Sequence, residues 1–177
     1  MGNGRTLVEL NLQTSQSNDL IWTHDLWINS FAAAWYDTVN DRRCVIYEGS
    51  FLVDYVVDSG SRRYLIPSLK TSAHSIVAGT AISSTGDMQR NTPVAVAFDN
   101  GKVFLYYCGR GAAGGIRRTI RTNNTWGTSS LIDSRTISQD SQLTVVRANG
   151  INHLFFVARD QNEEEDDYFV HYPDEIS

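Results

Sequence analysis

The chain has 177 residues, of which 41% are hydrophobic and 20% are charged, and its formal net charge is −5. This length is enough for one domain with a sizeable core, while the negative charge gives no electrostatic footprint for nucleic-acid binding. No run of about 18 apolar residues that could span a membrane is present, and the N-terminus, MGNGRTLVEL, lacks the apolar stretch of a secretory signal. We therefore expect a cytoplasmic protein with no nucleic-acid partner and no membrane span.

The first predicted element is an N-terminal strand over residues 5–12, where apolar and polar residues alternate in TLVELNL. A repeat unit near 30–70 follows. It begins with the small-residue run FAAAW and continues through the alternating run RRCVIYEG into FLVDYVVD. These patterns predict antiparallel strands.

The second repeat unit, near 92–132, has the clearest strand and turn signals. We place its strands at 93–98, 102–107, 115–121 and 126–132. Asn100-Gly101 separates the first two, and an Asn-Gly pair between apolar runs is the strongest short-range hairpin signal because its turn needs positive φ at both positions.

The third repeat unit, near 141–173, carries Asn149-Gly150 at the same place, 49 residues after Asn100-Gly101. Only three strands are visible in it, the last within DDYFVHY. The N-terminal strand has no evident partner, so it is predicted to supply the missing outer strand and join the two ends of the chain.

A period near 49 residues is typical of repeated sheets such as propeller blades, and the small residues that open each unit suit the crowded centre of a propeller. The predicted fold is all-β: a β-propeller of four-stranded antiparallel blades, about three to four per chain, forming one domain or half-propeller over residues 1–177. Propellers have about four to eight blades. Either a second chain completes the ring, or residues 5–29 and 70–91 hold degenerate blades. An open sheet edge favours the oligomer, and a homodimer is expected.

The second unit resembles a blade of the fungal fucose-specific lectins of the Aleuria type. The residues that carry the resemblance are the Thr92-Pro93 start, the pair Tyr106-Tyr107, GGIR at 114–117, and Trp126 followed by Gly127. It extends more weakly over the other two units. The resemblance implies a lectin-like propeller that binds carbohydrate in sites between its blades.

In such lectins an Arg, a Glu and an aromatic ring hold the sugar. The positions equivalent to the Arg are Cys44, Phe104 and His153, and those equivalent to the Glu are Asp54, Arg118 and Asp167. Because no unit keeps both partners, the resemblance implies an altered sugar pocket. The expected ligand-binding residues are Tyr106, Arg118 and Trp126 in the second unit, with His153 and Asp167 in the third.

Three functions remain open on this reading, and one of them is an interaction module with no small ligand. The first is a lectin-like protein that binds a carbohydrate or small ligand. The second is a cofactor-free enzyme, such as a cyclase, isomerase or pericyclase of fungal natural-product biosynthesis. Phe104 and Cys44 would make its pocket more apolar and suit an apolar small molecule. No catalytic residue can be named, so enzymatic activity stays undecided.

No cofactor is expected. The histidines His24, His74, His153 and His171 are scattered without the spacing of a metal site. Cys44 and Cys108 lie in strand-like runs and are expected to be buried, reduced thiols.

Overall fold

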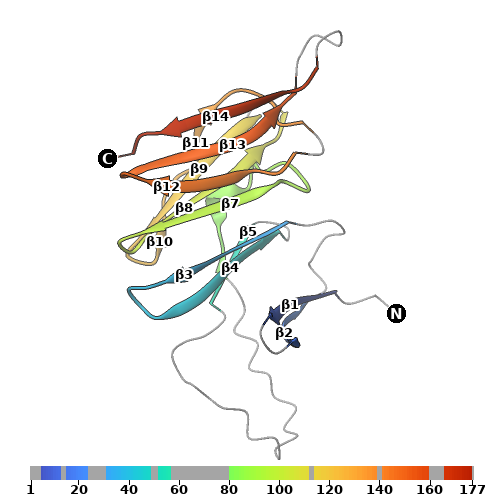
Figure 1. Ribbon diagram of the computed structural model, residues 1–177, viewed down its shortest axis with the longest axis vertical. Coiled ribbons are helices and arrows are strands. Elements are labelled where there is room, and N and C mark those ends of the chain that lie inside the picture. Colours follow the sequence, from blue (N-terminus) through green and yellow to red (C-terminus); the bar gives the residue numbers. More distant parts are fainter. Residues whose placement is uncertain are drawn as a thin grey trace, which may run out of the picture.

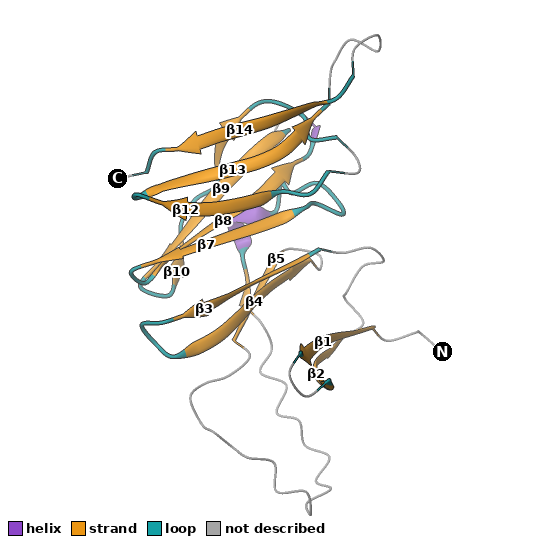
Figure 2. Ribbon diagram, in the orientation of Figure 1, coloured by secondary structure: helices purple, strands orange, loops and turns teal. Residues whose placement is uncertain are grey.

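The computed structural model describes residues 5–12, 15–23, 31–48, 52–56, 80–111, 114–138, 141–159 and 166–176. This part of the chain consists of antiparallel strands, with short 3₁₀ turns such as η1 (Ser83–Thr85) between them (Figure 2). It contains no helix that is long and apolar enough to cross a membrane. The predicted all-β class is therefore confirmed.

The first sheet has four strands in the order β3-β4-β5-β6. They are β3 (Ala32–Asp37), β4 (Arg42–Glu48), β5 (Leu52–Val56) and β6 (Thr80–Ala81). Asp37 shapes the β3–β4 turn, because its Oδ1 accepts the backbone N–H groups of Val39 and Asn40, each at 3.1 Å. The outer strand β6 lies past residue 70, where the sequence placed the end of this unit.

The second sheet has five strands and matches the predicted unit closely. They are β7 (Val94–Asp99), β8 (Lys102–Gly109), β9 (Gly115–Thr122), β10 (Thr125–Trp126) and β11 (Ser130–Asp133). Asn100 and Gly101 have φ of 47° and 80°, so the predicted hairpin turn is confirmed. The strand predicted at 126–132 is divided in two, and both pieces pair with β9.

The third sheet has the three expected strands, in the order β12-β13-β14. They are β12 (Thr144–Ala148), β13 (Ile151–Ala158) and β14 (Tyr168–Asp174). Asn149 and Gly150 have φ of 51° and 79°, which repeats the turn of the second sheet.

The N-terminal strand does not complete the third sheet. β1 (Arg5–Asn11) forms a hairpin with β2 (Gln16–Thr23), with Asn11 opposite Gln16 and Arg5 opposite Thr23. Closing this short local loop costs far less chain entropy than pairing with the other end of the chain. The prediction that residues 5–12 join the two chain ends was therefore wrong.

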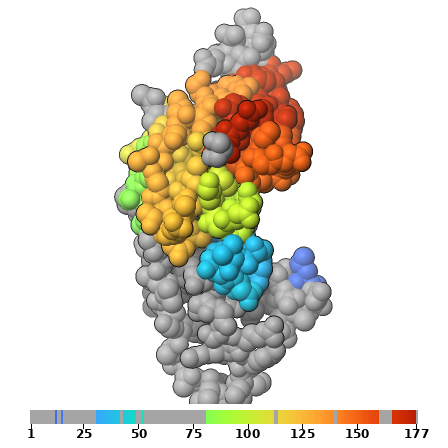
Figure 3. Space-filling view, turned by 90° about the vertical axis from the view of Figure 1, so that its left-hand side faces the viewer, coloured from blue at the N-terminus to red at the C-terminus, as the bar shows by residue number. Residues whose placement is uncertain are grey.

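The three larger sheets stack face to face in sequence order. β7 contacts both β3 and β12, so the first strands of the sheets lie next to one another (Figure 1). The space-filling view shows the same order, from the first sheet in cyan to the third in orange and red (Figure 3). Among the described residues the sheets form an open stack rather than a closed ring.

Each pair of neighbouring sheets encloses its own core. Alternate residues of the second sheet point to opposite sides, so Leu105 and Tyr107 pack toward the first sheet while Phe104 and Tyr106 pack toward the third. These four side chains are at most 2% exposed, and burying one such side chain stabilises the fold by about 1.5–3 kcal/mol.

An aspartate at the end of the first strand ties each sheet to its successor. Asp37 at the end of β3 pairs with Arg121 of the second sheet at 3.8 Å. Asp99 at the end of β7 accepts Nε of Arg147 of the third sheet at 2.9 Å. An Asp–Arg contact between neighbouring sheets thus occurs at both interfaces.

Candidate functional site

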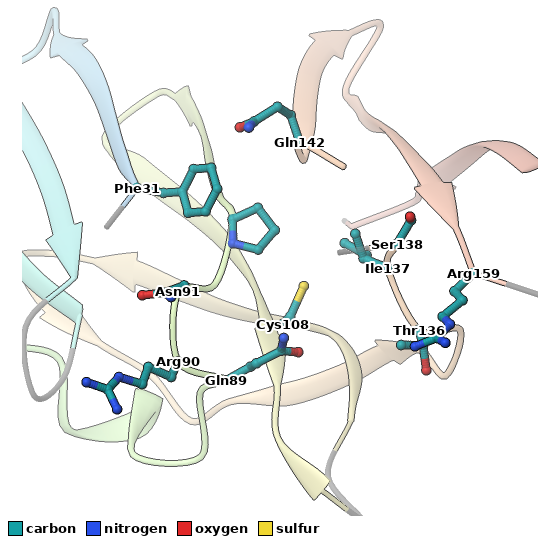
Figure 4. A pocket seen from close by; sticks show the side chains of 11 residues that line it. Phe31, Gln89, Arg90, Asn91, Cys108, Thr136, Ile137, Ser138, Gln142 and Arg159 are labelled. Carbon is teal, nitrogen blue, oxygen red and sulfur yellow. The ribbon is translucent and has the colours of Figure 1, made fainter. Parts of the chain in front are cut away.

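A cavity of about 520 Å³ lies where the segments that lead into the first strands of the three larger sheets meet. Residues before β3, β7 and β12 contribute to it, together with Cys108 near the end of β8 and Arg159 just after β13. It is lined by Phe31, Gln89, Arg90, Asn91, Pro93, Cys108, Thr136, Ile137, Ser138, Gln142 and Arg159. Figure 4 shows Arg90 and Asn91 on one side and Thr136, Ser138 and Arg159 on the other.

Two walls of the cavity are built the same way in successive repeats. Met88 forms an isolated bridge with Gly109, and Ile137, 49 residues later, forms one with Ala158. Each wall segment is thereby held against the second strand of its own sheet. Backbone bonds reinforce this: the Gln89 N–H donates to the Cys108 carbonyl at 2.7 Å, and the Ser138 N–H donates to the Val157 carbonyl at 2.9 Å.

A buried glutamate from the first sheet positions the cavity residue Asn91. Oε1 of Glu48 accepts the backbone N–H of Asn91 at 2.7 Å. Burial raises the pKa of the Glu48 carboxyl, although the Asn91 hydrogen bond and the charge of Arg90 oppose that shift. Asn91 itself has a φ of 55°, so this bond fixes an uncommon backbone conformation.

Cys108 lies between the two sides, with its sulfur pointing into the cavity (Figure 4). Burial raises the pKa of its thiol to about 12, although the hydrogen bond with Thr92 opposes the shift. The thiol is therefore uncharged at neutral pH, and only the thiolate is a good nucleophile or metal ligand. Both Cys44 and Cys108 are buried and free, as expected from the sequence.

The lining of the cavity is mainly polar. It offers amide, hydroxyl and guanidinium groups, and none of its described residues is Asp, Glu or His. Phe31, Pro93 and Ile137 add apolar surface. The volume lies within the range of about 300–1,000 Å³ that is usual for small-molecule sites. Such a lining can hold a hydroxyl-rich molecule.

Tyr106 and Arg118 lie together, but in a closed network between the second and third sheets. The Tyr106 hydroxyl donates to Asp174 Oδ2 at 2.7 Å and accepts Nδ2 of Asn152 at 2.6 Å. Nη1 of Arg118 donates to Asp174 Oδ1 at 2.6 Å. Burial, followed by the bond to Asp174, raises the pKa of Tyr106. These groups fasten two sheets together.

Trp126 lies on the opposite side of the second sheet from Tyr106. The guanidinium carbon Cζ of Arg121 lies 5.8 Å from the centroid of the Trp126 ring and 5.4 Å from the centroid of the Trp35 ring. Arg121 also pairs with Asp37. Trp126 thus takes part in the contact between the first and second sheets.

His153 lies in β13 of the third sheet, and Asp167 lies just before β14. Nδ1 of His153 is 2.9 Å from Nε2 of His171, and the two rings stack. Asp167 is exposed. The five predicted residues therefore do not converge on one site, and their part in ligand binding stays a prediction.

The arginines of the second unit are mostly engaged with acidic partners. Arg117 pairs with Asp87 at 2.7 Å, and Arg118 and Arg121 have the aspartate partners described above. Arg110 is exposed, and its backbone N–H donates to the carbonyl of Asp87. The described residues contain no group of three or more His, Cys, Asp or Glu that could hold a metal, and His24 and His74 lie outside the described part.

The sequence prediction missed the cavity residues because they lie in short irregular segments ahead of each first strand. The 49-residue period could have found the walls, since it also relates Met88 to Ile137 and Arg110 to Arg159. No protein-family model matches the chain, and a search of curated proteins found no match to it.

Proposed function

We propose that this protein binds a carbohydrate or a similarly hydroxyl-rich small molecule in the cavity shared by its three sheets. The observation that carries the proposal is the lining: hydrogen-bonding side chains and two arginines surround a space of about 520 Å³, beside the aromatic face of Phe31. Amides, hydroxyls and guanidinium groups bind sugar hydroxyls, and an aromatic face covers the apolar side of a sugar ring.

The scaffold proposed for this function is propeller-like. Three antiparallel sheets in sequence order, with their first strands adjacent, support a radial arrangement of blades. The resemblance of residues 92–131 to a blade of the fungal fucose-specific lectins supports a lectin-like class. A homodimer that completes the ring is part of the same proposal, because three sheets are fewer than the usual number of blades.

The polarity of the cavity favours binding over cofactor-free catalysis. The enzyme interpretation depended on Phe104 and Cys44 making a pocket apolar. Both side chains are 2% exposed, and neither lines the cavity. Several lining side chains, including Arg90 and Arg159, are exposed, whereas a reaction that relies on positioning alone benefits from a site closed to water.

Titration calorimetry with L-fucose, D-mannose, D-galactose and D-glucuronate tests the proposal. At least one sugar should bind with a Kd of about 1 mM or tighter, which corresponds to roughly −4 kcal/mol. Arg159→Gln should weaken that binding at least tenfold, because it removes a charge-assisted hydrogen bond worth about 1.5–3 kcal/mol.

Arg110→Gln is the matched control. Arg110 occupies the equivalent place one repeat earlier and does not line this cavity, so its replacement should leave the affinity unchanged. An absence of heat with all four sugars at millimolar concentration would refute carbohydrate binding. Equal losses in both arginine variants would refute the placement of the site.

A further inference from the structure

The two ends of the sheet stack are not equivalent, and the repeat shows how they differ. The second and third sheets are related by 49 residues, so Ala97 and Tyr106 of the second sheet correspond to Val146 and Phe155 of the third. In the second sheet these side chains are at most 6% exposed, because the third sheet covers them. The corresponding face of the third sheet has no fourth sheet against it among the described residues.

This outer face of the third sheet comprises Thr144, Val146, His153, Phe155, Phe169 and His171. It is rich in exposed apolar surface: Val146 is 50% exposed and Phe169 is 69% exposed. Phe155 stacks on Phe169 at 6.1 Å and on His171 at 4.9 Å. A continuous patch of this kind on a protein surface marks an interaction site.

At the other end of the stack, the first sheet has an outer face that matches the outer face of the third sheet. Ala33 and Trp35 of β3 pack on the second sheet, so Ala32, Ala34 and Tyr36 point away from it and are exposed. These three residues form the β3 part of the outer face of the first sheet. Its β4 part includes Val45 and Tyr47, which lie opposite Ala34 and Ala32 and are each 6% exposed, so β3 offers the exposed strip of this face.

Asp37 and Asp99 end β3 and β7 in the same way, so Ala32 and Ala34 correspond to Val94 and Val96. Val94 and Val96 belong to the face with which the second sheet packs on the first. The outer face of the first sheet therefore corresponds to the face with which the second sheet packs on the sheet before it. The outer face of the third sheet corresponds to the face of the second sheet on which the following sheet packs.

We infer that a second copy of this chain packs the outer face of its first sheet onto the outer face of the third sheet, head to tail. The contact continues the geometry of the two interfaces within the chain. Two copies then bring six larger sheets to one ring, within the range of about four to eight blades. The inference rests on the propeller-like arrangement proposed above and names the two surfaces that would close it.

Analytical ultracentrifugation of the full chain and of single charge-introducing variants tests the inference. The wild type should sediment as a dimer at micromolar concentration. Phe169→Glu and Val146→Glu change the third sheet, Ala34→Glu changes the first, and each should raise the dimer dissociation constant at least tenfold. All three side chains are exposed, so the variants should fold, as circular dichroism would verify. Leu131→Glu, also exposed but on β11, is the control that stays dimeric.

Mixing distinguishes head-to-tail packing from a face-to-face pair of third sheets. An equimolar mixture of Phe169→Glu and Ala34→Glu retains one unmodified contact, so heterodimers should form more readily than either variant forms homodimers. A monomeric wild type would overturn the inference, and so would an Ala34→Glu variant that dimerises normally while Phe169→Glu does not. Sugar titrations on the same samples separate the outcomes: a dimer that binds no sugar would leave the interface standing and refute only the ligand proposal.

Discussion

Asp174 is predicted to be the most sensitive polar residue of the interface between the second and third sheets. It is 6% exposed, and its carboxylate accepts hydrogen bonds from the Tyr106 hydroxyl and from Nη1 of Arg118. Asp174→Ala would leave the Arg118 guanidinium, whose side chain is 18% exposed, without this carboxylate. Removing one partner of a largely buried ion pair costs about 3–5 kcal/mol.

Urea unfolding followed by tryptophan fluorescence measures this loss. The control is Asp167→Ala, which removes an exposed carboxylate next to the same strand and should change the free energy of unfolding by no more than about 0.5 kcal/mol. Arg118→Met isolates the pair, since Met keeps much of the apolar stem but has no charge.

In the double variant Asp174→Ala/Arg118→Met no charge is left unpaired, so the combined loss should be smaller than the sum of the single losses by about 1.5–3 kcal/mol. Strict additivity, or a loss below about 0.5 kcal/mol for Asp174→Ala alone, would refute the role of this network in holding the sheets together.

Three further predictions follow from single residues. Burial raises the pKa of Glu48 in the folded protein above its ordinary value of 4.5, so the wild type loses stability as pH rises from that value through the higher folded pKa. The melting temperature of Glu48→Gln relative to the wild type should therefore increase between pH 4 and pH 7. A difference in melting temperature that does not change with pH would contradict this. Gly150 has a φ of 79° with nothing within 4 Å of an added Cβ, so Gly150→Ala should cost about 1–2 kcal/mol from backbone strain alone, and an unchanged urea midpoint would refute the turn geometry. Cys44 and Cys108 are buried, and burial raises the pKa of the Cys108 thiol, so Ellman's reagent should label both thiols far more slowly before denaturation than after it. Rapid labelling of the native protein would contradict this.

Local signals in the sequence were sufficient to predict most of the second and third sheets. Asn100-Gly101 and Asn149-Gly150 locate two hairpins by backbone geometry alone, and the strands on either side follow from alternation. The pairing of β1 with β2 could not be predicted in the same way, because the stretch QSNDLIWT that forms β2 is polar in its first half and shows no clear alternation.

The candidate site depended on contacts between distant residues, which the sequence did not specify. Tyr106 was expected to bind ligand, yet its hydroxyl meets Asp174, 68 positions away, and nothing in the sequence around Asp174 indicates that partner. The cavity combines Phe31 of the first unit with Gln142 of the third. Only the stacking of the sheets brings these residues together.

The most direct test of the shared cavity is a ¹H–¹⁵N correlation spectrum recorded as the tightest of the four sugars is added. The backbone amides of Gln89, Asn91, Ser138 and Arg159, which line the cavity, are predicted to shift together with saturation at a single affinity. Shifts confined to Trp126 or to the His153–His171 face, with the cavity amides unmoved, would contradict a binding site at the meeting point of the three sheets.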